Sequence, residues 1–117
     1  MNEVQLKNRT KEYAKNVIRL CRKLPNNREG RLIGNQMFRS GTSVAANYRA
    51  ACRGRSKAEF VSKLAIVEEE ADETLFWLEL IKGMSISKDP AIDLLMKEGN
   101  EIVAIIVSSI KTVKRRN

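Results

Sequence analysis

Basic side chains recur at helical spacing in the first half of the chain, and the chemistry they offer is the binding of phosphate. Lysine and arginine neutralise the phosphates of nucleic acids without reading their sequence. In the segment 2–24 they recur every three or four residues, and in 26–53 they fall within an arc of roughly 80° on a helix. The candidate nucleic-acid-binding residues are Lys7, Lys11, Lys15, Arg19, Arg22, Arg28, Arg31, Arg49 and Arg53.

The charge of the chain is divided unevenly along its length. Residues 1–57 contain 14 Lys or Arg and 3 Asp or Glu, a net charge of +11, whereas residues 58–117 contain 8 and 11, a net charge of −3. A strongly basic half points to a polyanionic partner, and a solubilising surface is the alternative. No aromatic residues alternate with the basic ones, so the pattern does not indicate sequence-specific recognition of single strands.

The residue types needed for most enzymatic chemistry are missing. The chain contains no His, which excludes an imidazole general base, a His-containing triad and the Glu-x-x-His pattern of di-iron bundles. It has neither a P-loop nor a GxGxxG motif. The acidic run 68–73 points around a helix rather than at one spot, so a solvated or ion-paired face is expected there and not a metal site. We therefore expect no enzymatic activity, no metal and no cofactor.

The two cysteines, Cys21 and Cys52, lie in apolar helical contexts without CxxC spacing, which favours two buried free thiols over a disulfide or a metal site. The chain has no apolar run of roughly 18 residues and no signal-peptide pattern at its start. A cytoplasmic protein that does not enter the membrane is therefore expected.

Apolar residues recur with alternating spacings of three and four in four segments, which predicts four amphipathic helices. The first should run from about Asn2 to Leu24, because Pro25 cannot continue a helix. The second should begin at Asn26, which with Glu29 resembles a capping box, and should continue to residue 53.

The third helix should begin after Ser56, whose S-x-x-E pattern is a capping box, and should fade at residues 83–85. Asp89 and Pro90 supply a cap and a first helical residue for the fourth. Four helices of this length joined by short loops predict an all-α, up-down-up-down antiparallel four-helix bundle, formed as a single domain by residues 1–117.

The segment 39–49 is rich in Ser, Thr, Gly and Asn, which are mediocre or poor helix formers, although it lies in the middle of the second helix. Tertiary packing is expected to hold it helical. A second apolar strip on this helix needs a further neighbour, either another helix of the bundle or another subunit. The strip consists of Phe38, Ala45 and Cys52, which are seven residues apart.

Antiparallel pairing of the second and third helices across the turn at Gly54 brings Arg39 close to Asp72. We expect Arg39 to pair with a carboxylate of the third helix, with contact to a ligand as the alternative. Ser43 and Asn47 are expected to satisfy other acidic side chains at the edge of the core.

Several segments together resemble the bacterial four-helix-bundle proteins encoded in intervening sequences of 23S rRNA genes. The resemblance covers essentially the whole chain, including Leu24-Pro25. Residues 49–50 and 67–69 depart from it, because the family more often has an acidic residue and an Ala/Lys pair there. The segments that carry the resemblance are Arg39–Tyr48, Ser56–Phe60, Lys63-Leu64 and Glu69–Leu78.

This resemblance implies a left-handed up-down bundle that assembles as a ring-like homopentamer. The chain is also similar to the accessory proteins of diversity-generating retroelements, which are basic pentameric bundles associated with a reverse transcriptase and nucleic acid. No enzymatic activity is established for the family. A neighbouring subunit then becomes a candidate partner for the second apolar strip, and the expected oligomer interface comprises Phe38, Gly41, Ala45 and Cys52.

The function expected from the sequence is a non-enzymatic homo-oligomeric bundle that binds RNA or other nucleic acid through the basic face of its first two helices. The alternative is a protein-interaction scaffold that docks a partner such as a polymerase or a reverse transcriptase. A metal-dependent hydrolase using the acidic run of the third helix is disfavoured, because those acids are spread around the helix.

Overall fold

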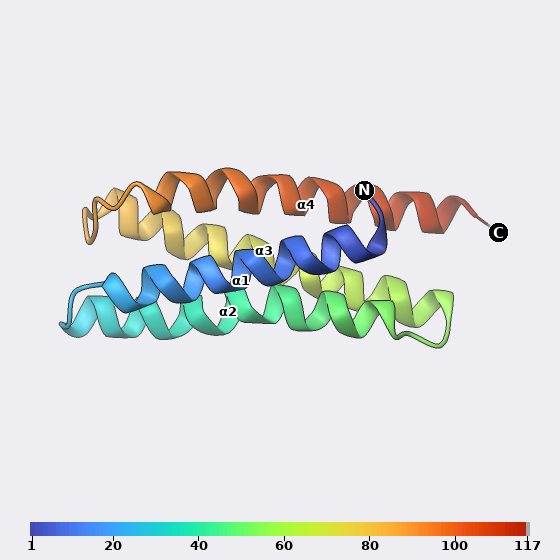
Figure 1. Cartoon of the computed structure of the whole chain (residues 1–117), viewed down its shortest axis with the longest axis horizontal. Helices are drawn as coiled ribbons and strands as arrows, with labels where there is room; N and C mark the ends of the chain where they lie inside the picture. The colour runs from blue at the N-terminus through green and yellow to red at the C-terminus, as the bar shows by residue number, and fades with distance from the viewer. Residues whose placement is uncertain (117) are drawn as a thin grey trace.

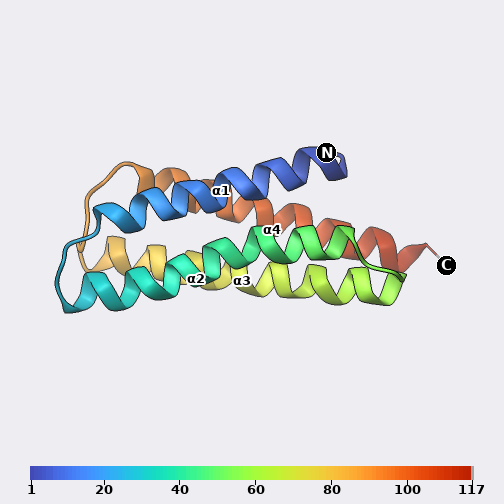
Figure 2. The ribbon, with the colours of Figure 1, turned by 60° about the horizontal axis from the view of Figure 1, so that its bottom comes forward.

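The computed structural model describes residues 1–116, which form four antiparallel helices joined by short turns. They are α1 (Glu3–Lys23), α2 (Arg28–Cys52), α3 (Lys57–Gly83) and α4 (Ala91–Arg115). The described residues contain no strand, and the bundle is about 50 Å long and 20 Å across. The start of α1 and the end of α4 lie toward the end of the bundle where α2 turns into α3, as Figures 1 and 2 show. The predicted up-down-up-down four-helix bundle is confirmed.

Two of the three predicted capping signals are used, at the starts of α3 and α4, and α1 has a capping box that was not predicted. Helix α4 begins at Ala91, one residue after the predicted Pro90. Asn2 and Gln5 form a reciprocal capping box on α1, with N···O distances of 2.8 and 3.1 Å. The Ser56 hydroxyl accepts a hydrogen bond from the backbone N–H of Glu59, and the Asp89 carboxylate accepts one from the N–H of Ala91. These bonds satisfy backbone donors that the first helical turn leaves free.

The predicted start of α2 is wrong by one residue. Asn27, not Asn26, caps the helix, and its side-chain oxygen lies 2.9 Å from the backbone nitrogen of Gly30. Asn26 instead accepts a hydrogen bond from the Arg31 guanidinium at 3.1 Å. Either asparagine has the chemistry of a cap, and the path of the turn after Pro25 decides which one reaches a free N–H.

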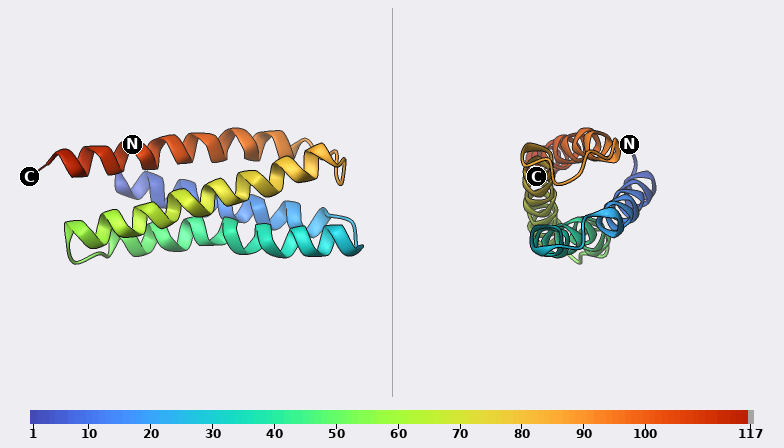
Figure 3. Two further views of the ribbon diagram at one scale, coloured as in Figure 1. Left: turned by 180° about the vertical axis from the view of Figure 1, so that it is seen from behind. Right: turned by 90° about the vertical axis from the view of Figure 1, so that its left-hand side faces the viewer.

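The apolar faces of all four helices meet in one core. The end view in Figure 3 shows the four helices arranged around a common axis. The small, polar middle of α2 is held helical by close packing on both sides, as expected. Gly41 is buried against Val17 of α1, and a Cβ atom built on it would lie 2.7 Å from a Val17 methyl carbon. On the other side, the fully buried hydroxyls of Ser40 and Thr74 lie 2.8 Å apart, in hydrogen-bonding contact.

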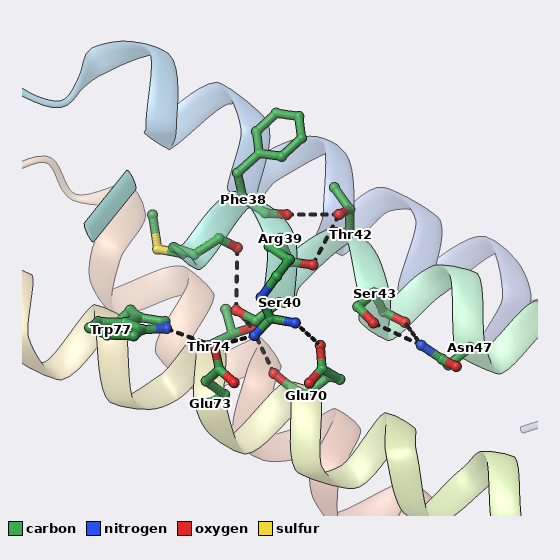
Figure 4. Close-up of polar contacts among 11 residues, drawn as sticks. Phe38, Arg39, Ser40, Thr42, Ser43, Asn47, Glu70, Glu73, Thr74 and Trp77 are labelled. Carbon is green, nitrogen blue, oxygen red and sulfur yellow. Dashed lines mark hydrogen bonds and ion pairs between the residues drawn. The ribbon is translucent and has the colours of Figure 1, made fainter. Parts of the chain in front are cut away.

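The predicted ion pair between Arg39 and α3 is confirmed, with different acids. Arg39 binds Glu70 at 2.7 Å and also Glu73, one on each side of the expected Asp72. Figure 4 shows the guanidinium between the two carboxylates. The indole N–H of Trp77 donates to Glu73 at 3.1 Å, which fixes that carboxylate.

The expectation that Ser43 and Asn47 pair with acidic side chains is wrong. The Asn47 amide donates to the hydroxyl of Ser43 at 2.7 Å and to its backbone carbonyl at 2.9 Å (Figure 4). Two polar side chains four residues apart on one helix are direct neighbours, so each finds a partner without crossing to α3.

Charge reversal at Arg39 should lower the free energy of unfolding. Arg39→Glu removes two charge-assisted bonds and places a third carboxylate beside Glu70 and Glu73. Because Arg39 is half exposed, each pair contributes only about 0.2–1 kcal/mol, and a total loss of about 1–2 kcal/mol is expected. Urea denaturation followed by circular dichroism measures it. Arg49→Glu is the control, since Arg49 is exposed on the same helix and forms no ion pair within residues 1–116.

The same variant predicts a pH dependence. The hydrogen bond from Trp77 and those from Arg39 hold the pKa of Glu73 below its ordinary value. A carboxylate with a lowered folded-state pKa stabilises the fold above its unfolded pKa, and this contribution is lost as the pH falls through the lowered value. The stability difference between the parent protein and Arg39→Glu should therefore shrink below about pH 4. Equal stability of the two proteins at pH 7 would contradict the role assigned to the pair.

The α1–α4 contact is the least extensive of the four contacts between neighbouring helices, and a charged cluster that the sequence did not predict bridges it. Arg9 of α1 forms two bonds of 2.6 Å with the carboxylate of Glu98 on α4, and Glu101 lies 3.3 Å from the same guanidinium. The side chains of Arg9 and Glu98 are only 23% and 30% exposed. None of the helices, within residues 1–116, has an apolar stretch long enough to cross a membrane.

Candidate nucleic-acid interface

All nine predicted nucleic-acid-binding side chains are exposed, but the structure does not gather them on one continuous stripe. They separate into a group near the α2–α3 turn and a group along the rest of α1 and the start of α2. The first group is Lys7, Lys11, Arg49 and Arg53. The second is Lys15, Arg19, Arg22, Arg28 and Arg31.

The first group lines a groove of about 470 Å³ between α1 and α2. Two lysines stand on the α1 side and two arginines on the α2 side, and Val4, Ala45 and Ala46 supply small or apolar lining. None of the four cations forms an ion pair within the described part of the chain. Four cations without acidic partners around a concave surface make a site for a polyanion.

A second hollow of about 470 Å³ lies between α2 and α3 and adjoins the groove. Ala46, Arg49 and Arg53 line both. Two further cations, Arg55 and Lys63, line this hollow together with one acid and one alanine, Glu59 and Ala50. The sequence did not indicate Arg55 and Lys63 as part of this surface, because Arg55 lies in the turn and Lys63 in a half of the chain with negative net charge.

Several cations of the second group already have partners within the chain. Lys15 forms an ion pair with Glu12 at 3.0 Å, and Arg19 donates to the side chain of Asn16 at 2.8 Å. In each pair the two residues lie about one helical turn apart, on the exposed face of α1. Arg22 and Arg31 line a separate hollow beside Pro25, at the opposite end of the bundle from the groove.

The antiparallel topology concentrates positive charge at the end of the bundle where α2 turns into α3. The segments 1–11, 46–65 and 108–116 meet there and contain 12 Lys or Arg and 2 Glu, a net charge of +10, whereas the rest of the chain carries −2. Lys57 at the start of α3 donates to the backbone carbonyl of Arg116 at the end of α4, which places the basic end of α4 beside the turn. The charge is therefore polarised along the axis of the bundle.

The residues predicted for the oligomer interface lie mostly beside α1. Phe38 is 47% exposed and lines the hollow near Pro25, and Ala45 lines the basic groove. Phe38 points away from α3 in Figure 4. Cys52 is half-buried. The neighbour of this strip within the chain is thus α1, which is the first of the two alternatives left open by the sequence.

Gly41 needs a correction, because it is buried inside the chain against Val17 and does not present a surface to another subunit. A glycine at this position serves the close approach of α1 and α2. The role of Phe38, Ala45 and Cys52 in assembly stays a prediction.

The two cysteines are free, and the cysteines and acids of the described residues do not cluster as a metal site would require. Cys21 and Cys52 are free thiols, as predicted, but both are half-buried and not buried as expected. Burial raises the pKa of Cys21 to about 11 and raises that of Cys52, so both favour the protonated thiol at neutral pH. Residues 1–116 contain no cluster of three Cys, Asp or Glu side chains with the geometry to hold a metal ion.

The fold and this site define a class of protein, a small basic four-helix bundle with a cationic groove. The model of the 23S rRNA-intervening sequence protein family matches residues 2–108, and the chain belongs to this family. A crystal structure of a protein of unknown function from the S23 ribosomal protein family of Bacteroides thetaiotaomicron is similar over 95% of this chain and 99% of that one. The two share 32% sequence identity and a TM-score of 0.87. A comparison with curated proteins found no match.

Proposed function

We propose that this protein binds RNA or other nucleic acid, without sequence specificity, through the basic surface of α1 and α2. The observation that carries the proposal is the groove in which Lys7, Lys11, Arg49 and Arg53 face a common space without acidic partners. Phosphates supply the missing counter-charges, and the release of condensed ions drives the binding. The other five predicted residues form the separate second group along the rest of α1 and the start of α2, and they would add contacts toward the opposite end.

The distribution of charge argues against a purely solubilising role. A solubilising surface mixes both signs of charge, as the rest of this bundle does with pairs such as Lys15–Glu12 and Lys82–Asp93. At the α2–α3 end, acids are nearly absent and the like charges repel one another. Such a concentration of one sign raises the local potential for a polyanion and steers its approach.

The test is a salt titration of binding to a fluorescently labelled RNA hairpin. Four phosphate contacts predict that log Kd rises with log salt with a slope of about 3–4. Arg49→Ala should weaken binding and reduce this slope by about 1. Lys97→Ala is the matched control, because it removes one exposed positive charge from α4 outside the groove and should change little. Absent binding at low salt, or indifference to Arg49→Ala, would count against the proposal.

A protein-docking scaffold is the second candidate. Exposed apolar side chains favour it, since Leu32, Phe76 and Leu94 are 57%, 49% and 69% exposed. A partner such as a polymerase or reverse transcriptase should then stay bound to the purified protein after nuclease treatment, whereas a nucleic-acid-mediated complex should dissociate. The homo-oligomer, a pentamer by family resemblance, belongs to either proposal, and light scattering measures its mass against the 13.3 kDa of one chain.

A further inference from the structure

We infer that the bound partner is a single strand of nucleic acid whose path crosses α2, from the α1–α2 groove into the α2–α3 hollow. This inference rests on the proposed function and adds the path, the strandedness and two residues of the turn and α3. The two concave spaces are contiguous, because Ala46, Arg49 and Arg53 line both. These three residues form the ridge between them.

The ridge is suited to a phosphate backbone. Ala46 is exposed and has a small side chain, so a strand can approach the helix closely at this point. Arg49 and Arg53 are four residues apart, which separates them by about 6 Å along one face of α2. Each guanidinium can therefore contact the phosphates of a strand that crosses the ridge from one hollow to the other.

Cations continue on both sides of the ridge. Lys7 and Lys11 stand on the far wall of the α1–α2 groove, and Arg55 and Lys63 line the α2–α3 hollow. Six cations and one acid, Glu59, thus line a path across three helices. A path confined to α1 and α2 would leave Arg55 and Lys63 facing an empty hollow with a single carboxylate.

The dimensions of the path favour a single strand over a duplex. Packed helices lie about 8–10 Å apart, so crossing α2 from one groove to the next requires the ligand to bend over a distance of about 20 Å. Double-stranded DNA has a persistence length of about 500 Å and cannot follow that curvature cheaply, whereas a single strand can. No aromatic side chain lines either hollow, so the strand is held by its phosphates and not by stacking of its bases.

The experiment compares labelled oligouridine with an RNA duplex of the same length, by fluorescence anisotropy across salt concentrations. The variant Arg55→Ala/Lys63→Ala should weaken oligouridine binding about tenfold and reduce the salt slope by about 1.4, as expected for two lost contacts to a single strand. Lys82→Ala/Lys97→Ala removes the same charge elsewhere and should change the Kd less than about twofold, since its charges lie far from the path. Circular dichroism verifies folding, which these exposed or half-exposed positions should tolerate.

A second variant tests the ridge without removing a positive charge. Ala46→Glu places a carboxylate at an exposed position between the two hollows. It should weaken the binding of oligouridine more than Ala104→Glu does, because Ala104 is an exposed position of α4 outside the path. The comparison separates a blocked path from a general reduction of net charge, because both variants change the charge equally.

The outcomes distinguish this inference from the proposed function. If Arg49→Ala weakens oligouridine binding while Arg55→Ala/Lys63→Ala leaves it unchanged, the path across α2 is wrong and the basic groove stands. Tighter binding of the duplex than of oligouridine overturns the assignment of a single strand. If neither ligand binds the parent protein at low salt, the proposed function itself fails.

Discussion

Replacing Gly41 by valine should lower the free energy of unfolding by about 3 kcal/mol, which is the upper part of the usual range for an overpacked core. A Cβ atom at this position would lie 2.7 and 2.9 Å from the two methyl carbons of Val17 and 3.0 Å from its Cβ atom. Val17 is fully buried, so it has no open space into which to move. The two helices must therefore separate, and their packing is lost along with the clash. Urea denaturation followed by circular dichroism measures the loss.

Gly83→Ala is the matched control for this variant. Gly83 is the last residue of α3, and a Cβ atom there would meet nothing within 4 Å. Alanine should be tolerated or slightly stabilising, because it loses less backbone entropy on folding than glycine does. If Gly41→Val unfolds at the same urea concentration as the parent protein, α1 and α2 do not pack as closely as described.

The contact between Gly41 and Val17 predicts that the stability effects of substitutions at these two residues are not additive. Gly41→Ala alone should destabilise the protein, and Val17→Ala alone should destabilise it by creating a cavity. In the double variant, the methyl group added at Gly41 occupies space vacated by Val17. The combined loss should therefore be smaller than the sum of the two single losses by about 1 kcal/mol or more.

Arg9→Ala should be the most destabilising substitution of a charged residue, at about 2–3 kcal/mol, within the range for charge-assisted hydrogen bonds. It removes both 2.6 Å bonds to Glu98 and leaves that carboxylate near Glu101 without the cation between them. The partner side chains are partly shielded from water, so solvent compensates poorly for the loss. Because the α1–α4 contact is the least extensive in the bundle, amide hydrogen exchange should also accelerate along α1.

Lys15→Ala is the control for Arg9→Ala. Lys15 lies on the same helix and is also ion-paired, to Glu12 at 3.0 Å, but both side chains are about half exposed or more. An exposed pair of this kind contributes little to stability, because water solvates both charges when the pair is broken. A double-mutant cycle between Arg9→Ala and Glu98→Gln isolates the pair, and a coupling energy near zero would show that the bridge does not hold α1 against α4.

The secondary structure could be predicted from the sequence because its signals are local. Hydrophobic spacing of three and four identified all four helices, and Ser56 and Asp89 marked two helix starts through bonds to residues two or three positions away. Arg39 could be paired with α3 because a short turn fixes the register of two antiparallel helices. Asn26 and Asn27 offer the same capping chemistry, so the sequence alone could not decide which of them caps α2.

The candidate site was only partly predictable, because its residues come from different helices. Spacing along one helix shows which side chains share a face, and it correctly grouped Lys7 with Lys11 and Arg49 with Arg53. It could not show that these two pairs face one groove while Lys15 is neutralised by Glu12. Nor could it join Arg55 and Lys63 to the surface, because Arg55 lies in the turn and Lys63 lies on a third helix, in a half of the chain with negative net charge.

The sequence by itself determined the four helices, their antiparallel order and the basic character of the first half, since each follows from spacing and composition. Only the tertiary structure decided where that charge accumulates. Antiparallel packing brings the start of α1, the turn at Gly54 and the end of α4 to one end of the bundle, so a chain of net charge +8 carries +10 there and −2 elsewhere. The physical reason is that electrostatic potential depends on distances through space, which the packing of the helices sets and the spacing along any one helix does not.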